Sequence, residues 1–186
     1  TGHFKVHSSG MVGECVAGTQ VRALSLCLPA AAGGAGGVYI AAVGAKEVAT
    51  VWRVSFAPGG GQESRLQTKF VSMMEPKGGL RPKTKRKAGE GKSAADLRYM
   101  AVDTFSHELR RGVDVLFMLV SLSDATVRLV ALEIDEETGS SEWLGQACHL
   151  VGGSQNPTLS VGCVVLGDDG TTVAFTGSTD GMVCCW

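Results

Sequence analysis

The stretch Thr171–Trp186, TTVAFTGSTDGMVCCW, contains the pattern that decides the fold. Two short runs with strand-like residues, 171–176 and 182–186, flank a polar turn. Within that turn, Asp180-Gly181 is a pair that supplies the left-handed backbone of a tight hairpin. The stretch is therefore predicted to form a β-hairpin.

The same pattern occurs twice earlier in the chain, with turn residues at Lys46 and Asp124. An apolar run precedes each turn, and an apolar or aromatic residue follows the turn residue by six positions, at Trp52, Val130 and Trp186. The turn residues of successive copies are 78 and 56 residues apart. Because an undecorated four-stranded propeller repeat has roughly 40 to 45 residues, insertions are expected between the copies.

Composition favours a globular β protein. The 186 residues are 44% hydrophobic and 19% charged, and 26 of them are glycine, which suits many tight turns better than long helices. The longest apolar stretches, 21–32 and 115–120, are well short of the roughly 20 residues that span a bilayer. No membrane association is expected.

The cysteines indicate free thiols in a reducing compartment. The six are scattered, no CxxC pair occurs, and the side chains of Cys184 and Cys185 should point to opposite faces of a strand. Neither a zinc site nor a disulfide framework is indicated. We expect mostly buried thiols, no metal and a cytoplasmic or nuclear protein.

No pattern points to catalysis. The four histidines are isolated in sequence, and there is no Gly-x-Ser-x-Gly elbow. The run Gly89–Ser93 ends like a phosphate-binding loop, but Arg86 occupies the place of the required glycine and no apolar strand leads into it. We therefore expect a protein without enzymatic activity and without a cofactor.

The chain divides into five segments. We expect a lead-in or the end of a preceding blade at 1–20, a four-stranded blade at 21–74, an insertion at 75–96, a second blade at 97–150 and a third, one strand short, at 151–186. Within these blades, 21–28 is predicted to be a buried strand and 106–112 a polar connection.

The insertion is the one stretch with a marked charge. Its Lys and Arg residues could neutralise phosphates and bind RNA, could form a nuclear import signal, or could belong to a disordered linker. Outside residues 77–92 the chain has 10 basic and 17 acidic residues, a net charge of −7. The candidate RNA contacts are Lys77, Arg81, Lys83, Lys85, Arg86, Lys87 and Lys92.

A hydrogen-bond network is expected around the third turn. Asp180 can accept a hydrogen bond from a hydroxyl on the preceding strand, that of Thr176 or Ser178, and the network can extend to the indole N–H of Trp186. Such a network would fix the hairpin rather than bind a ligand.

These residues resemble a WD40 repeat. The stretch Thr176-Gly-Ser-Thr-Asp-Gly-Met-Val-Cys-Cys-Trp186 is similar to its second and third strands, whose usual form is Ser-Gly-Ser-x-Asp-Gly-x-apolar-x-apolar-Trp-Asp. The other two copies have Val130 in place of Trp and Lys46 in place of Asp, and the Gly-His pair that opens a repeat is absent from all three. The resemblance implies an all-β fold: a partial WD40 β-propeller with about three four-stranded blades, the last incomplete.

A narrower resemblance concerns the second and third blades. The stretch Arg98-Tyr-Met-Ala-Val102, the hairpin after it and the terminal Ser-Thr-Asp-Gly are similar to the C-terminal region of the WD repeat-containing protein 6 family. That resemblance implies a cytoplasmic, non-catalytic scaffold that partners a tRNA 2'-O-methyltransferase acting at the wobble position of the anticodon loop. Because propellers have four or more blades, we also expect the chain to be part of a larger protein.

A second function remains open at this point. The propeller could be a general protein-interaction module in a ubiquitin ligase, chromatin or signalling assembly, with the basic insertion as a linker or import signal. In either case the partner is a protein, with tRNA as an additional partner in the first.

Overall fold

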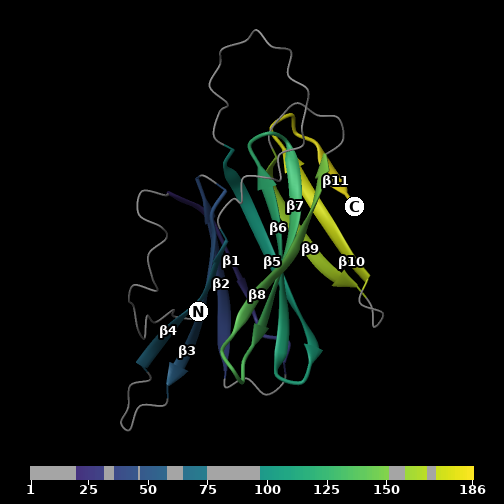
Figure 1. Cartoon of the computed structure of the whole chain (residues 1–186). Helices are drawn as coiled ribbons and strands as arrows, with labels where there is room; N and C mark the ends of the chain where they lie inside the picture. Colours follow the sequence, from purple (N-terminus) through teal and green to yellow (C-terminus); the bar gives the residue numbers. More distant parts are fainter. Residues whose placement is uncertain are drawn as a thin grey trace, which may run out of the picture.

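The structure, a computed structural model, describes residues 20–31, 36–45, 47–57, 65–74, 97–150, 158–166 and 171–186. Every regular element in these ranges is a β-strand, which confirms the all-β prediction (Figure 1). The strands are β1 (Val21–Cys27), β2 (Gly37–Gly44), β3 (Ala49–Ala57), β4 (Arg65–Met74), β5 (Tyr99–Arg110), β6 (Val113–Leu122), β7 (Thr126–Asp135), β8 (Ser141–Leu150), β9 (Thr158–Leu166), β10 (Thr171–Ser178) and β11 (Val183–Cys185).

The strands form three antiparallel sheets in which each strand pairs with its neighbour in sequence. Sheet 1 has the order β1-β2-β3-β4 and sheet 2 the order β5-β6-β7-β8. Sheet 3 consists, in the described ranges, of β9, β10 and β11, with β10 in the middle. Each sheet lies within one of the three stretches in which the sequence predicts a repeat.

The second and third strands of the three sheets pair in the same register. In every case the paired residues are equidistant from the turn position, which is 46 in sheet 1, 124 in sheet 2 and 180 in sheet 3. The pairs three positions on either side of the turn are Val43 with Ala49, Ser121 with Val127, and Gly177 with Val183.

The turns that set this register share one backbone conformation. The residue directly after each turn position has a left-handed φ: 58° at Glu47, 64° at Ala125 and 81° at Gly181. Glu47 and Ala125 are the only non-glycine residues with positive φ in the described ranges. Since such angles are uncommon outside glycine, their recurrence at one repeat position shows that the three hairpins are built alike. In the third turn, Gly181 alone of the expected Asp-Gly pair has a positive φ.

A β-bulge also recurs at one position. Where the first strand of each sheet pairs with the second, the register shifts by one residue, and the extra residue is Arg22, Met100 or Leu159. In all three sheets the second strand pairs across the shift with the residues that lie two and three positions before the turn position. Each bulge lies at the start of its strand and alters the local twist there.

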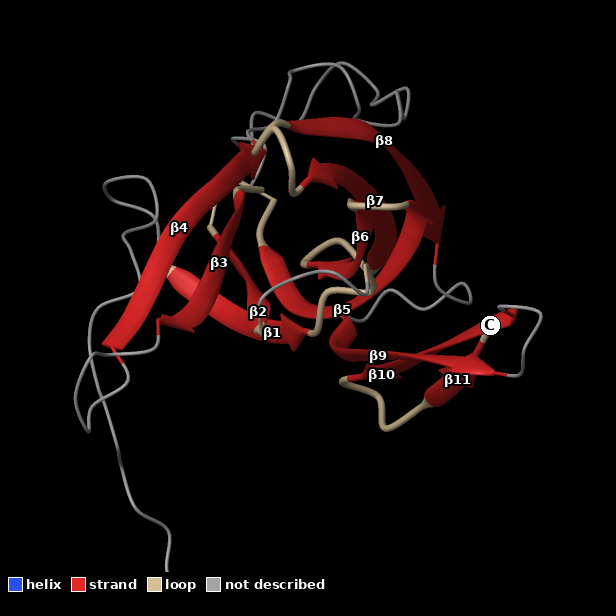
Figure 2. Ribbon diagram, turned by 90° about the horizontal axis from the view of Figure 1, so that it is seen from below, coloured by secondary structure: helices blue, strands red, loops and turns tan. Residues whose placement is uncertain are grey.

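The sheets fan out from their first strands. β1 lies against β5, and β5 lies against β9 (Figure 2). Sheets 1 and 2 also meet at their last strands, where the hydroxyl of Ser141 of β8 donates to the backbone carbonyl of Val71 of β4 at 3.1 Å. The described residues form three sheets of such a fan, and no closed ring is formed by them.

The faces of the sheets pack in one order. In each sheet, the residues of the second and third strands that are an odd number of positions from the turn lie on one side, which we call the odd face. The opposite side is the even face. The odd face of sheet 1 packs on the even face of sheet 2, where Leu116, Met118 and Leu132 are fully buried. The odd face of sheet 2 packs on the even face of sheet 3, through Leu119 and Val127 against Val161, Cys163 and Ala174.

Two predictions about single strands are wrong. Residues 106–110 of the expected polar connection 106–112 continue β5, because β6 pairs with β5 as far as Arg110 and leaves only a turn at Arg111-Gly112. The stretch 21–28 does form β1 over Val21–Cys27, but Leu24 and Leu26 are exposed because none of the three sheets covers the even face of sheet 1 at β1.

Candidate functional site

The predicted RNA-contact residues Lys77, Arg81, Lys83, Lys85, Arg86, Lys87 and Lys92 lie outside the described residues, as does the whole insertion 75–96. The first twenty residues are likewise outside, apart from residue 20. The RNA contact therefore stays a prediction.

The residues predicted around the third turn do lie together. The indole Nε1 of Trp186 donates to Thr176 Oγ1 at 3.1 Å. The hydroxyl of Ser178 donates to Asp180 Oδ1, which also accepts the backbone N–H of Met182 at 3.2 Å. Thr176 is buried, and the backbones of Trp186 and Ala174 exchange hydrogen bonds of 2.8 and 3.1 Å. These bonds hold β10 and β11 together through and beyond the turn.

The other two copies have no side chains for the same bond. The positions equivalent to Thr176 and Trp186 are Ala42 and Trp52 in sheet 1, and Val120 and Val130 in sheet 2. Neither Ala42 nor Val120 has a hydroxyl to accept an indole N–H. The side-chain bond is therefore specific to sheet 3, whereas the backbone register is common to all three sheets.

Sheets 1 and 2 are joined at the turn end by an ion pair that the sequence did not reveal. Arg128 Nη1 of β7 donates to Glu47 Oε2, next to the first turn, at 2.6 Å. The side chain of Arg128 is only 4% exposed, and Tyr99 of β5 interacts with its guanidinium. Burial by itself lowers the pKa of Arg128, but the hydrogen bond and charge of Glu47 outweigh it, so that the net pKa is raised. Burial raises the pKa of Tyr99 to about 12, so its phenol stays protonated.

A second polar network joins the same two sheets at their other end. The fully buried carboxylate of Asp114 accepts the backbone N–H of Ala31 at 2.7 Å and the hydroxyl of Tyr39 at 3.2 Å. The Tyr39 hydroxyl also contacts Glu136, which forms an ion pair with Arg53. Burial and then the charge of Asp114 raise the pKa of Tyr39 to about 12. The two networks fix both ends of the interface between sheets 1 and 2.

One carboxylate connects all three sheets at their first strands. Asp103 of β5 accepts the hydroxyl of Ser25 of β1 at 3.2 Å and the backbone N–H of Cys163 of β9 at 2.7 Å. The Ser25 hydroxyl is also 2.8 Å from that of Thr104. Since β1, β5 and β9 are the strands from which the sheets fan out, Asp103 holds the point where the sheets converge.

The thiols at this point are poor nucleophiles. Burial, with the nearby charge of Asp103, raises the pKa of Cys163 to about 12. Burial also raises the pKa of Cys27. The thiolate is the reactive form, so neither side chain offers a nucleophile at neutral pH. The four cysteines with described side chains are free, as expected, but none of them is fully buried. Cys27, Cys163 and Cys184 are half-buried and Cys185 is exposed, which corrects the expectation of buried thiols for these four residues.

In the described ranges, no group of three or more His, Cys, Asp or Glu side chains is placed to hold a metal ion. No helix in these parts of the chain is long and apolar enough to cross a bilayer.

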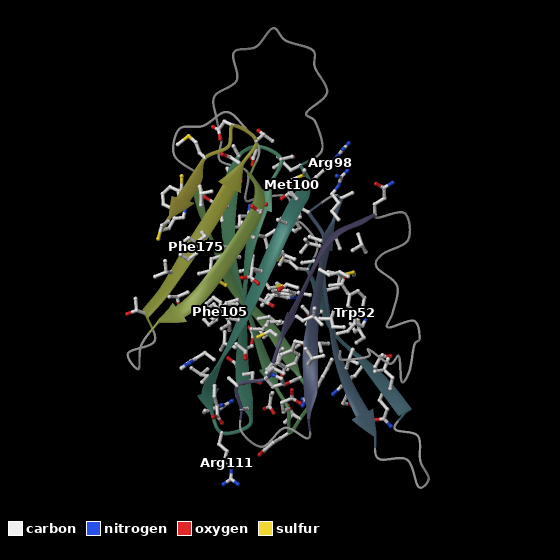
Figure 3. All side chains as sticks on the ribbon, turned by 180° about the vertical axis from the view of Figure 1, so that it is seen from behind. Trp52, Arg98, Met100, Phe105, Arg111 and Phe175 are labelled. Atoms are coloured by element: carbon white, nitrogen blue, oxygen red, sulfur yellow. The ribbon has the colours of Figure 1, made fainter. Side chains whose placement is uncertain are left out.

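Large apolar side chains are exposed on sheets 1 and 3. Leu24, Leu26 and Phe70 are exposed on sheet 1. Phe175 and Val183 are exposed on the odd face of sheet 3. Figure 3 shows Phe175 on the outer side of sheet 3 and Trp52 on the opposite side of the molecule.

Comparison of the chain with known protein families, with curated proteins and with solved structures gives no significant match in any of the three. The likeness to WD40 repeats therefore rests on the motif residues of the sequence.

The sequence does contain a signal for the inter-sheet bonds. Arg128 interrupts the apolar alternation of β7, and Asp103 interrupts that of β5. A charged residue at a position that the alternation marks as inward is expected to have a buried partner. The identity of that partner cannot be deduced locally, because Glu47 is 81 residues from Arg128.

Proposed function

We propose that this chain forms part of a WD40-type β-propeller that acts as a non-catalytic scaffold. The observation that carries the proposal is the common register of the three central hairpins. Each hairpin pairs symmetrically about its own turn position, which is 46 in sheet 1, 124 in sheet 2 and 180 in sheet 3. The recurring bulge and the convergence of β1, β5 and β9 support it, since successive propeller blades share one design and meet at their innermost strands. The raised pKa values of Cys27 and Cys163 favour a binding role over thiol chemistry.

The finer proposal is that the scaffold is the auxiliary subunit of a tRNA 2'-O-methyltransferase that modifies the wobble position. It is supported by the likeness of 98–102, the following hairpin and the terminal Ser-Thr-Asp-Gly to the WD repeat-containing protein 6 family. The basic run 77–92 would supply phosphate contacts to the tRNA. The exposed apolar faces would supply contacts to the methyltransferase.

Affinity purification of the full-length protein from cells tests the finer proposal. A tRNA methyltransferase should copurify, and depletion of the protein should lower 2'-O-methylation at the wobble position without lowering it at other tRNA positions. Copurification of ubiquitin ligase, histone or signalling proteins, with wobble methylation unchanged, would contradict the proposal and favour the general interaction propeller.

The basic run has a separate test. Replacing Lys83, Lys85, Arg86 and Lys87 by Ala should weaken tRNA binding and reduce the slope of log K against log salt by about 3, because each lost phosphate contact removes about 0.7 to 0.9. Replacing the exposed Arg110 and Arg111 is the matched control, since they lie outside the run. An unchanged affinity and slope in the first variant would show that the run does not bind RNA.

A further inference from the structure

The two strands between which the basic insertion lies in sequence meet it at the same end of the sheets. β4, the strand before the insertion, pairs with β3 so that Met74 lies opposite Ala49, three residues after the first turn position. β5, the strand after the insertion, starts directly after Arg98, which forms a β-bridge with Ala45 beside the same turn position. We call this end of the sheets, where the turns at 46 and 124 lie, the turn end.

The covalent chain keeps the basic run 77–92 close to the turn end. Lys77 is three residues from Met74, and Lys92 is six residues from Arg98. Because an extended chain spans at most about 3.6 Å per residue, Lys77 is within roughly 11 Å of Met74 and Lys92 within roughly 22 Å of Arg98. A nucleic acid that binds the run is therefore held next to the turn end of the sheets.

Two arginines are exposed at the turn end. Arg22 is the extra residue of the bulge in β1, and neither it nor Arg98 forms an ion pair with another described residue. The backbone of Arg98 is fixed by both turns, because it bridges Ala45 and exchanges hydrogen bonds of 3.1 and 3.0 Å with Ser123. The N–H of Ala45 also donates to the carbonyl of Gln20, two residues before Arg22, at 3.2 Å. Both guanidinium groups thus extend from backbone that flanks the first turn.

The opposite end of the sheets is acidic and does not suit a polyanion. Five carboxylates lie in and beside the turn that follows β7: Glu133, Asp135, Glu136, Glu137 and Glu142. Arg53 and Arg110 at this end form ion pairs with two of them. Figure 3 shows Arg98 and Arg111 at opposite ends of the molecule. A phosphate backbone is attracted to the turn end and repelled at the other.

We propose that the RNA-binding surface of this chain extends from the basic run onto the turn end of the sheets, where Arg22 and Arg98 contact phosphates of the bound tRNA. A guanidinium suits this contact because it binds a phosphate through two parallel N–H donors. Since the backbone of Arg98 is already held by two turns, little further ordering is needed on binding. The inference rests on the RNA contact of the proposed function and adds the part of the folded sheets that shares it.

Binding of unfractionated tRNA to the 186-residue chain, measured by fluorescence anisotropy between about 50 and 200 mM salt, tests this surface. Arg22→Gln with Arg98→Gln should lower the slope of log K against log salt by about 1.5 and the affinity by on the order of 10-fold at about 0.1 M salt, because two phosphate contacts are lost. Arg22→Lys with Arg98→Lys keeps both charges and should retain the wild-type slope. Arg110→Gln with Arg111→Gln removes the same charge from the acidic end and is the matched control, which should leave the slope unchanged. Circular dichroism checks that each variant is folded.

The result for the basic run separates a failure of this inference from a failure of the proposed RNA contact. If the four-residue variant of the run lowers the slope and the glutamine pair at the turn end does not, the run binds RNA and its extension onto the sheets is wrong. An equal loss in the control at the acidic end would also overturn the extension, because the effect would then not depend on position. A wild-type chain that does not bind tRNA would overturn both the RNA contact and its extension.

Discussion

Replacing Glu47 by Ala removes the carboxylate that pairs with the buried guanidinium of Arg128. The bond is 2.6 Å long and the guanidinium is almost fully enclosed, so water cannot replace the lost partner. Leaving one member of a buried pair without the other costs about 3 to 5 kcal/mol. Ala and Glu adopt a left-handed backbone at a similar cost, so the φ of 58° at position 47 adds little to the difference in stability between the two proteins.

Urea denaturation followed by circular dichroism measures this loss. For an m value of about 2 kcal/mol/M, the unfolding midpoint should fall by about 2 M. Arg128→Met should cost less, because Glu47 lies beside a turn and can be hydrated more easily, and the double variant should recover part of the stability. The coupling energy of the double-mutant cycle should exceed about 2 kcal/mol and should persist in 1 M NaCl, because a buried pair is screened weakly.

The pair Arg110–Glu133 provides the control. Its atoms are 4.0 Å apart and Arg110 is 68% exposed, so Arg110→Ala should cost less than about 1 kcal/mol. A Glu47→Ala variant as stable as this control, or a coupling energy near zero, would refute the reasoning, because the ion pair would then be solvated and would not join the sheets.

The remaining predictions concern the turns and the thiols. Gly181→Ala should lower the free energy of unfolding by about 1 kcal/mol. The whole loss comes from the left-handed φ of 81°, because a Cβ at this position meets no atom within 4 Å. Gly36 is equally open and has no left-handed φ, so Gly36→Ala should be nearly neutral in the same urea titration. At pH 8 iodoacetamide should label exposed Cys185 much faster than Cys163, whose pKa of about 12 keeps it protonated; equal labelling by mass spectrometry would contradict this. The pKa of Asp135 is lowered chiefly by the backbone N–H of Thr138. The contribution of this carboxylate to stability is therefore present above its unfolded pKa of about 3.9 and is lost as the pH falls through the lower folded pKa. An NMR titration that gives Asp135 a pKa at or above the ordinary value would contradict this prediction.

The hairpins were predictable because their information is local. The turn at 124 and the apolar runs beside it predict two paired strands, and the structure has β6 at Val113–Leu122 and β7 at Thr126–Asp135. The turn after β7 has Asx geometry, with Asp135 Oδ1 accepting two backbone N–H groups and Gly139 at a φ of 71°. A short turn fixes the register of its own hairpin without help from the rest of the chain.

The end of β5 was not predictable in this way. The polar stretch from Ser106 has the composition of a loop, yet it pairs with β6 as far as Arg110. An edge strand of a sheet can expose polar side chains to solvent, so its length is set by the backbone partner rather than by hydrophobicity. Composition alone therefore placed the strand end too early.

The burial of residues between sheets could not be predicted from the sequence either. The alternation that marks Leu24 and Leu26 as inward is the same as that of buried positions, and they are exposed because their face lacks a neighbouring sheet at β1. Likewise, Asp103 binds Ser25 and Cys163 from positions 78 and 60 residues away. Which faces meet depends on how the sheets are arranged, and no local pattern encodes that arrangement.

The turn nevertheless has an effect well beyond its own hairpin. Because side chains alternate along a strand, the register about positions 46, 124 and 180 decides which residues of each sheet lie on its odd face and which on its even face. A shift of one residue at position 124 would move Val130 and Leu132 of β7 away from sheet 1 and Val127 away from sheet 3. The conserved geometry of three short turns thus accounts for the odd-to-even order in which the sheets stack. That order, rather than side-chain identity, is what the three repeats have in common, and this explains how Trp52, Val130 and Trp186 can occupy one repeat position in sheets of one design.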